Sequence, residues 1–257
     1  MLKNVPTTVR RILVHTENIL NLNELKIKAG QNPTDELIES LKITLDRWAP
    51  VTNGITDTLE IRGNSGHAAS IPESESRSDL KISVKVFISS LKTDALSEAL
   101  EKVFAVLEVT FIDSLVLAYP SKSEPSMLLP ALQELWQVLE NYVAWQRLGS
   151  IGVSDVDTDV FISLYQWAKV KPSIIQINLA TCCVVPPALQ EFTKDHNVQL
   201  LTHSDPFEIL PRSALNDVFG AAEDAVSLFW ALRFQVHVKC RGVLASKGYL
   251  LCVHRTD

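Results

Sequence analysis

The stretch between Trp145 and Pro206 constrains the fold more than any other part of the chain. It contains three short apolar segments rich in branched side chains, each separated from the next by a segment of helical length. Strands joined in this way pair in parallel, with both faces of the sheet covered. The stretch therefore predicts an α/β fold. The expected strands are Ser150–Val153, Ile174–Asn178 and Val198–Thr202, and the expected helices are Thr158–Ala168 and Pro187–His196.

The same rhythm precedes this stretch and breaks after it. Arg11–His15 is interpreted as a first strand or as the start of an N-terminal helix. Asn32 and Pro33 are expected to open one helix, and Asp157 is a candidate N-cap of another. Further strands are predicted at Thr58–Arg62, Ile82–Ile88, Ser114–Ala118, Phe234–Lys239 and Tyr249–Val253, and further helices at Asp94–Leu107, Ala131–Trp145 and Ala221–Leu232.

Length allows one large core, because a complete (β/α) barrel needs about 250 residues and this chain has 257. We find no solenoid repeat and no convincing linker, so a single domain over residues 1–257 is expected. The segment Gly63–Asp79 is almost wholly small and polar. It is predicted to be a mobile loop.

Charge and cysteine content narrow the classes of partner and location. A net charge of −6 gives no reason to expect nucleic acid or an anionic membrane surface as a partner. The sequence contains no signal peptide and no apolar run of membrane-spanning length. None of the four cysteines has CxxC spacing, which favours a reducing compartment. A cytoplasmic protein is expected.

Common catalytic and nucleotide-binding motifs are missing. The sequence has no GxGxxG, GxxxxGK[ST], HExxH or GxSxG motif, which argues against a phosphate-binding loop of the usual kinds. His196 and His203 could approach Cys182 and Cys183, but the spacing is looser than that of a typical zinc site. We therefore expect no metal, and surface or loop positions for these histidines.

Three polar strand ends resemble those of the aldo-keto reductases. The matching segments are Gly152–Asp155, Gln176–Asn178 and Thr202–Ser204. The resemblance implies an aldo-keto-reductase-like (β/α)8 TIM barrel, and the early end of the chain implies that this barrel is irregular or truncated at its C-terminal end. In that fold the functional groups lie at the carboxyl ends of the barrel strands.

The resemblance also implies that the catalytic machinery of a reductase is incomplete. Reductases of this family use an aspartate, a tyrosine, a lysine and a histidine, with the tyrosine as general acid. Lys85 stands near the family's lysine, but Ala118 stands where the family has histidine. The segment Thr58–Gly63 lacks the required aspartate and tyrosine, and no tyrosine precedes Tyr119. No catalytic residue is therefore assigned.

Part of the cofactor pocket is retained. By resemblance, Ser154 and Gln176 occupy positions that hold the nicotinamide carboxamide, whereas Asp155 replaces an asparagine and His203 replaces a stacking tyrosine. Asp155 cannot donate as an amide can. We interpret Ser154 and Gln176 as a vestigial nicotinamide pocket and expect no cofactor. The alternative is an NADPH-dependent reductase with an altered active site.

Three longer blocks, LYQWAKVKP, QINLATCCVVPP and QLLTHSDP, narrow the resemblance to non-catalytic regulatory subunits built on the reductase barrel. This implies a heterodimer with a catalytic subunit whose activity the chain regulates. Cys182 and Cys183 are interpreted either as small buried side chains or as thiols at the subunit interface. Docking is expected near Cys182–Pro187 together with the C-terminal strands.

Overall fold

The computed structural model describes residues 5–22, 25, 32–48, 57–63, 71, 75–119, 125–178, 184–223 and 225–256. These residues form two compact units. One unit comprises Ile82–Pro206, and the other comprises Met1–Lys81 together with Phe207–Asp257. The expectation of a single barrel domain over residues 1–257 stays a prediction.

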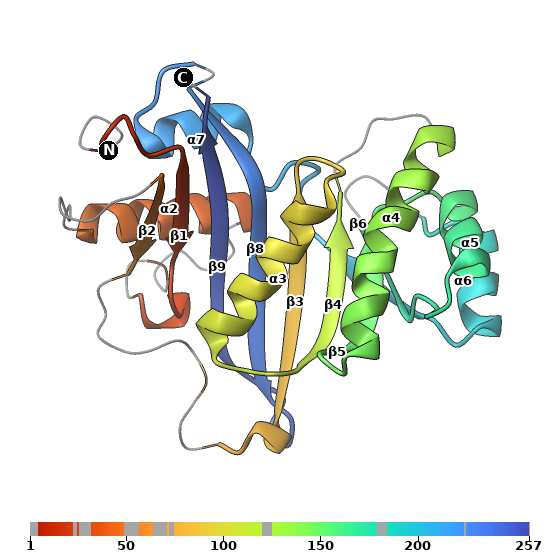
Figure 1. Cartoon of the computed structure of the whole chain (residues 1–257). Helices are drawn as coiled ribbons and strands as arrows, with labels where there is room; N and C mark the ends of the chain where they lie inside the picture. Colours follow the sequence, from red (N-terminus) through yellow and green to blue (C-terminus); the bar gives the residue numbers. More distant parts are fainter. Residues whose placement is uncertain are drawn as a thin grey trace. The chain divides into compact units, whose positions relative to one another are not determined.

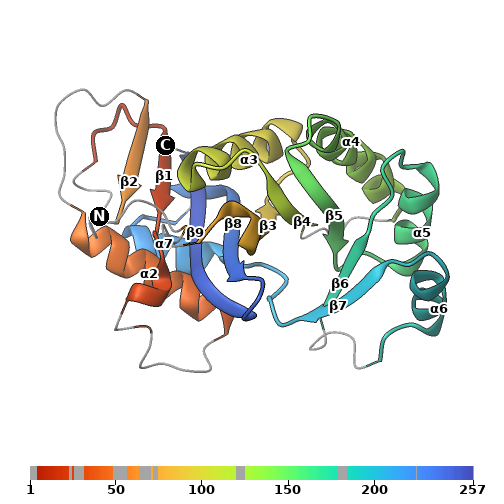
Figure 2. The ribbon, with the colours of Figure 1, turned by 90° about the horizontal axis from the view of Figure 1, so that it is seen from below.

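The unit Ile82–Pro206 is built from consecutive β/α repeats. Five strands pair in parallel in the order β3-β4-β5-β6-β7. The helices between them lie along one side of these strands (Figures 1 and 2). The elements are β3 (Leu80–Ile88), α3 (Thr93–Leu107), β4 (Ile112–Ala118), α4 (Pro125–Ala144), β5 (Leu148–Ser154), α5 (Thr158–Trp167), β6 (Ile174–Asn178), α6 (Pro187–Asp195) and β7 (Gln199–His203).

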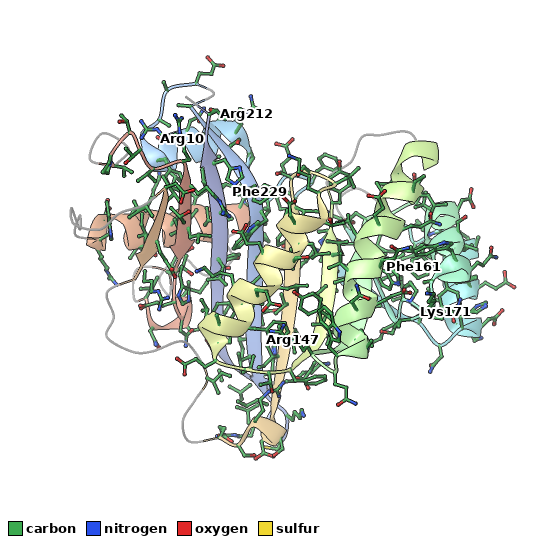
Figure 3. All side chains as sticks on the ribbon, viewed as in Figure 1. Arg10, Arg147, Phe161, Lys171, Arg212 and Phe229 are labelled. Carbon is green, nitrogen blue, oxygen red and sulfur yellow. The ribbon has the colours of Figure 1, made fainter. Side chains whose placement is uncertain are left out.

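The alternation predicted between Trp145 and Pro206 is confirmed, including the limits of β6. At the start of α5, Asp157 occupies the N-cap position, but its side chain makes no capping hydrogen bond. At the end of α5, Lys171 Nζ donates to three carbonyl oxygens at distances of 2.7 to 3.1 Å (Figure 3). A cation at this position satisfies carbonyl groups that have no partner inside the helix.

Helix α4 begins earlier than the sequence pattern suggested. A loop was expected before Ala131, but the helix starts at Pro125 and contains Pro130. Proline lacks the N–H that would bond to the preceding turn, and its ring crowds that turn. Here Pro130 lies near the start of the helix with an exposed side chain. Only one intrahelical hydrogen bond is therefore lost.

Helices α3 and α4 are held together by a polar and aromatic cluster (Figure 3). The hydroxyl of Tyr142 donates to Glu101 Oε1 at 2.6 Å, and the Arg147 guanidinium also donates to Glu101. The same guanidinium lies 4.0 Å from the ring centre of Phe104. The hydrogen bonds from Arg147 lower the pKa of the Glu101 carboxyl, although burial acts in the opposite direction.

The second unit combines a parallel strand pair with a long antiparallel hairpin (Figure 1). β1 pairs in parallel with β2 and antiparallel with β9, and β9 pairs antiparallel with β8. The Asn32 side chain accepts a hydrogen bond from the Asp35 N–H, which confirms the predicted start of α2. The elements are β1 (Arg11–His15), η2 (Ile19–Asn21), α2 (Pro33–Arg47), β2 (Thr58–Arg62), η3 (Arg77–Asp79), α7 (Arg212–Phe219), β8 (Val226–Val238) and β9 (Val243–Arg255).

The hairpin corrects one prediction. The helix expected over Ala221–Leu232 is wrong, because Val226–Val238 is a single strand. The strand predicted to begin at Tyr249 begins earlier, and Lys247 and Gly248 also lie within β9. Pairing with β9 along nearly the whole strand supplies hydrogen bonds that a local apolar pattern cannot reveal. The irregularity that was expected at the C-terminal end of the fold is therefore an antiparallel hairpin formed by β8 and β9.

Most of the predicted loop Gly63–Asp79 lies outside the described residues. Its last residues form the 3-10 helix η3, which leads directly into β3. Glu75, just before η3, forms an ion pair with Arg241 in the turn between β8 and β9. The mobility expected of this loop stays a prediction.

Candidate functional site

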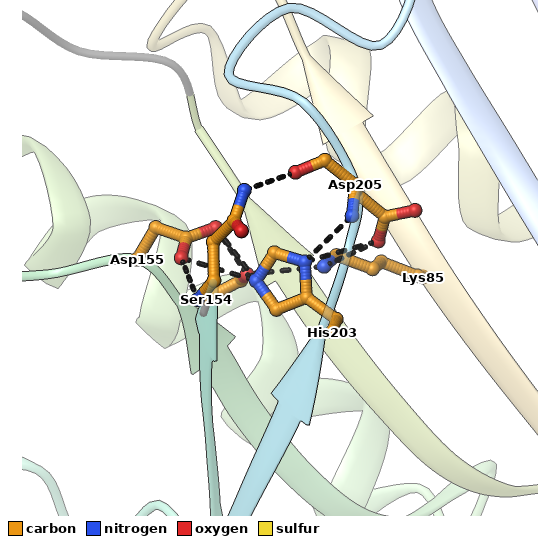
Figure 4. A network of polar contacts seen from close by, with 6 residues as sticks. Lys85, Ser154, Asp155, His203 and Asp205 are labelled. Atoms are coloured by element: carbon orange, nitrogen blue, oxygen red, sulfur yellow. Dashed lines mark hydrogen bonds and ion pairs between the residues drawn. The ribbon is translucent and has the colours of Figure 1, made fainter. Parts of the chain in front are cut away.

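The carboxyl ends of the parallel strands bring polar side chains from β3, β5 and β7 together (Figure 4). Lys85 comes from β3, Ser154 is the last residue of β5, and His203 is the last residue of β7. Asp155 follows β5 directly, and Asp205 lies two residues beyond the end of β7. We call these five residues the strand-end network. Parallel strands that start on one side must end on the other, so residues distant in sequence meet at this edge.

An ion pair lies at the centre of the strand-end network. Lys85 Nζ lies 2.8 Å from Asp205 Oδ2, and the two side chains are only 6% and 2% exposed. Lys85 Nζ also donates a hydrogen bond to Ser154 Oγ at 3.0 Å. Removing charges from water is costly, so a buried ammonium is tolerated only with such partners.

His203 connects the two carboxylates. The backbone N–H of Asp205 donates to His203 Nδ1 at 3.1 Å, so Nδ1 acts as an acceptor and the ring proton lies on Nε2. Nε2 lies 2.9 Å from Asp155 Oδ2 and 3.0 Å from Ser154 Oγ. In turn, the Ser154 hydroxyl donates to Asp155 Oδ2 at 2.8 Å. Every member of the strand-end network therefore has at least one partner inside it.

Asn178, the last residue of β6, donates one hydrogen bond to Asp155 and one to Asp205. Its N–H donates to Asp155 Oδ1 at 2.9 Å, and its side-chain amide donates to the carbonyl oxygen of Asp205 at 2.6 Å. Asp155 has a φ of 57°, in the left-handed region that asparagine and aspartate enter more readily than most residues. This backbone conformation turns the carboxylate of Asp155 back toward Asn178.

Two opposing effects act on the Asp155 carboxyl. Burial raises its pKa, but hydrogen bonds from His203, Ser154 and the Asn178 backbone lower it, and the lowering prevails. The carboxylate form is thus the one that the site stabilises. Because the network holds two carboxylates and one ammonium, the His203 Nε2–H and the Ser154 hydroxyl serve as additional donors to the Asp155 carboxylate.

Two of the four residues assigned from the sequence can be placed. Ser154 and Gln176 are register partners on β5 and β6, and a nicotinamide pocket at these residues stays a prediction. The Ser154 hydroxyl is engaged by the strand-end network, whereas Gln176 Oε1 is buried and has no hydrogen-bond partner among the described residues. Cys182 and Cys183 lie outside the described residues, so their role at an interface stays a prediction.

Sequence reasoning missed Asp205. Lys85 was expected near the reductase lysine, but its counter-ion was sought upstream near Thr58–Gly63 rather than after β7. The available signal was the polar run His203-Ser204-Asp205 at the end of a predicted barrel strand. Ala118, which the resemblance placed where the reductases have histidine, lies opposite Ser154 in the register.

Other kinds of site find no support in the described part of the chain. No group of three histidine, cysteine, aspartate or glutamate side chains there is arranged to hold a metal ion. Among the helices of the described ranges, none combines the length and the apolar character needed to cross a membrane. Two tyrosine hydroxyls are each engaged by a carboxylate. The Tyr142 hydroxyl donates to Glu101, and the Tyr249 hydroxyl donates to Glu36.

Comparison with known proteins places the chain in a family. Residues 62–206 match the model of the aldo/keto reductase family, and an aldo/keto reductase from Brucella melitensis aligns at 20% identity with a TM-score of 0.43 over 56% of this chain and 53% of that chain. Because the family model matches more than half of the chain, the chain belongs to the aldo/keto reductase family, and the expected α/β fold class is confirmed.

Longer matches narrow the assignment. The chain is 36% identical to the glutamate–cysteine ligase regulatory subunit of Mus musculus, over 94% of this chain and 92% of that protein. It is also 36% identical to the subunit of the same name from Homo sapiens, over 96% and 93% of the two chains. Within the reductase family, this chain therefore belongs with the glutamate–cysteine ligase regulatory subunits, and a regulatory role in glutathione synthesis follows.

Proposed function

We propose that this chain binds the catalytic subunit of glutamate–cysteine ligase without catalysing a reaction itself. In this role it improves the use of glutamate by that subunit and relieves feedback inhibition by glutathione. The observation that carries the proposal is similarity to the named regulatory subunits over nearly the whole of both chains. The proposed complex is a cytoplasmic heterodimer.

The contacts of the strand-end network support a non-catalytic role. In a reductase of this fold the lysine acts on a tyrosine that gives a proton to the carbonyl substrate, so the lysine must reach that hydroxyl. Here Lys85 Nζ instead contacts Asp205 and Ser154. Ala118 offers no imidazole. These contacts stabilise the ends of the strands, and carbonyl reduction by the family mechanism would lack its acid.

A subunit without chemistry of its own can regulate only by differential binding. To lower the KM for glutamate, it must bind the glutamate-competent conformation of the catalytic subunit more tightly than the other conformations. To relieve glutathione inhibition, it must bind the glutathione-occupied form less well. Both effects are equilibrium properties of the complex, and both can be measured without knowing the docking surface.

The decisive experiment combines binding with kinetics. The purified chain is mixed with a glutamate–cysteine ligase catalytic subunit, separated by size-exclusion chromatography, and assayed over glutamate and glutathione concentrations. We expect co-elution, a lower KM for glutamate and weaker inhibition by glutathione than for the catalytic subunit alone. Separate elution with unchanged kinetic constants would refute the proposal.

A reductase function is the second candidate, because Ser154 and Gln176 lie side by side as in a nicotinamide pocket. The fit to NADP(H) is incomplete. The buried Gln176 Oε1 could accept from a carboxamide, but the Ser154 hydroxyl is already used and Asp155 cannot donate as an amide would. Consumption of NADPH in the presence of a panel of aldehydes would favour this alternative.

The two adjacent cysteines provide a separate test. We propose that Cys182 or Cys183 can form a disulfide with a cysteine of the catalytic subunit, the two thiols passing two electrons and two protons to added peroxide. The double variant Cys182→Ser, Cys183→Ser should lose the cross-linked band on a non-reducing gel. The matched control is Cys240→Ser, which removes an exposed free cysteine. If the double variant still cross-links and the control does not, Cys240 is the bridge instead.

A further inference from the structure

The segment just before β3, residues 75–79, combines hydroxyl and charged side chains. Its sequence is Glu-Ser-Arg-Ser-Asp, and its last three residues form the 3-10 helix η3. Ser76 has one acidic residue directly before it, Glu75, and another three residues after it, Asp79. Protein kinases with a basic peptide groove select serines flanked in this way, because acidic side chains complement the groove. The local sequence therefore makes Ser76 a candidate for phosphorylation.

The Ser76 hydroxyl is held by its own turn. It donates a hydrogen bond to Asp79 Oδ2 at 2.6 Å and lies 2.6 Å from Ser78 Oγ, so the Ser78 hydroxyl is the donor in the second contact. Both partners come from within three residues of Ser76. Helix η3 has only three residues, and the hydrogen bonds of short 3-10 helices have poor geometry. A kinase can therefore take up this hydroxyl by unwinding a single turn, without breaking a strand.

Two cations from the turn between β8 and β9 lie on either side of Ser76. The Arg241 guanidinium pairs with the carboxylate of Glu75, one residue before Ser76. Lys239 Nζ donates to the carbonyl oxygen of Ser78 at 2.8 Å, two residues after Ser76. In Figure 1 this turn lies beside the segment that leads into β3. All of these residues belong to the same compact unit, so their contacts are internal to that unit.

We propose that Ser76 is a phosphorylation site and that Arg241 binds the phosphate. Ser76 Oγ attacks the γ-phosphorus of MgATP and forms the new O–P bond. The bond between that phosphorus and the oxygen bridging to the β-phosphate breaks, ADP leaves, and the hydroxyl proton passes to a base of the kinase. The phosphoserine carries about 1.5 to 2 negative charges at pH 7. A guanidinium binds such a group through two parallel charge-assisted hydrogen bonds.

Phosphorylation of Ser76 changes what joins η3 to the hairpin of β8 and β9. In the unmodified chain Arg241 contacts a carboxylate, which has one negative charge. After modification it contacts a phosphate with a larger charge, and Glu75 loses its partner. The phosphate also repels the Asp79 carboxylate, which accepted the hydroxyl proton before. The turn therefore opens while its link to the hairpin becomes stronger, and the chain directly before β3 rearranges.

The modification is tested on the full-length chain with casein kinase II, which selects acidic sites, and MgATP. Tandem mass spectrometry locates the phosphate, and circular dichroism checks that each variant is folded. We expect phosphate on Ser76, none in Ser76→Ala, and a rate within about twofold of the unaltered chain in the matched control Ser78→Ala, which keeps both acids. Asp79→Asn should slow the reaction at least about tenfold, because the kinase groove loses a charged partner. No incorporation, or phosphate on another residue instead, overturns the assignment.

The contact with Arg241 is tested on the phosphate itself. Phosphorus NMR of the phosphorylated chain follows the second ionisation of the phosphoserine, whose ordinary pKa is about 6. A nearby cation favours the dianion and lowers this pKa, so Arg241→Gln should raise it. The matched control is Arg62→Gln, which removes one positive charge that pairs with Glu60 on β2. Equal pKa values in all three phosphoproteins overturn the contact. Neither measurement requires the catalytic subunit, so both are independent of the proposed function.

Discussion

Lys85 and Asp205 form a buried ion pair, with 2.8 Å between Nζ and Oδ2, that joins β3 to the residues after β7. The sequence analysis expected Lys85 to stand near the catalytic lysine of the reductases. The ammonium therefore has a structural partner that is supplied from a different strand than the family pattern implies.

Replacing one member of this pair should be much worse than replacing both. Lys85→Met or Asp205→Asn leaves an unpaired buried charge, and we expect each to lower the free energy of unfolding by about 3–5 kcal/mol. The double variant has no such charge, so its loss should be clearly smaller than the sum of the two. Urea unfolding followed by circular dichroism measures all four proteins. Additive losses would mean that the two residues do not stabilise each other.

Acid should weaken the protein partly through Asp155. Its folded pKa lies below the ordinary value of about 3.9 because hydrogen bonds from His203 and Ser154 outweigh burial. A carboxyl with a depressed pKa contributes stability above its unfolded pKa and loses it as pH falls through the folded pKa. We expect Asp155→Asn to be less stable than the unaltered chain at pH 7, with a difference that shrinks below about pH 4. Urea midpoints between pH 7 and pH 2.5 test this, and a constant difference would contradict it.

Gly152→Ala should destabilise the protein, because even one methyl group does not fit at this position. A Cβ at this position would overlap the carbonyl oxygen of Ile174 and lie 2.6 Å from its Cβ. Because β5 and β6 pair directly there, Gly152→Ala must push the strands apart, and overpacking of this kind costs about 1–3 kcal/mol. Thermal unfolding should show the loss.

Gly242 offers the matched control for that substitution. Its φ is +61° and nothing lies within 4 Å of an added Cβ, so Gly242→Ala meets backbone strain alone. Such strain costs about 1–2 kcal/mol. A Gly152→Ala protein as stable as the unaltered chain would show that the β5–β6 contact relaxes easily.

We expect that NADPH does not bind to this chain. Ser154 is occupied by Lys85 and Asp155, so one of the two residues that could hold the nicotinamide carboxamide is unavailable. Titration with NADPH, followed by the emission of the five tryptophans and corrected for absorption, should show no saturable quenching. A catalytically active aldo-keto reductase serves as the positive control. Saturable quenching that Gln176→Leu abolishes would establish a working pocket.

The parallel strands could be predicted because each is identified by its own residues. Ile174–Asn178 is short, apolar and almost fully buried, and its predicted limits are the observed ones. The helix expected over Ala221–Leu232 failed for the opposite reason. The residues of β8 form a strand because β9, which follows in the chain, supplies their hydrogen bonds. Periodicity measures only the side chains of one segment, and it carries no information about such a partner.

The sequence by itself predicted that Ser154 and Gln176 would lie side by side, because parallel strands end at a common edge whatever their exact packing. The surface or loop position expected for His203 was wrong, because this residue ends β7 and its side chain is only 8% exposed. Because no tyrosine precedes Tyr119, the sequence also leads us to expect that the reductase acid is missing. Only the tertiary structure decided that Lys85 pairs with Asp205 and that Val226–Val238 is one long strand. Those two features depend on contacts between separate segments of the chain, and such contacts are fixed by packing rather than by any local pattern.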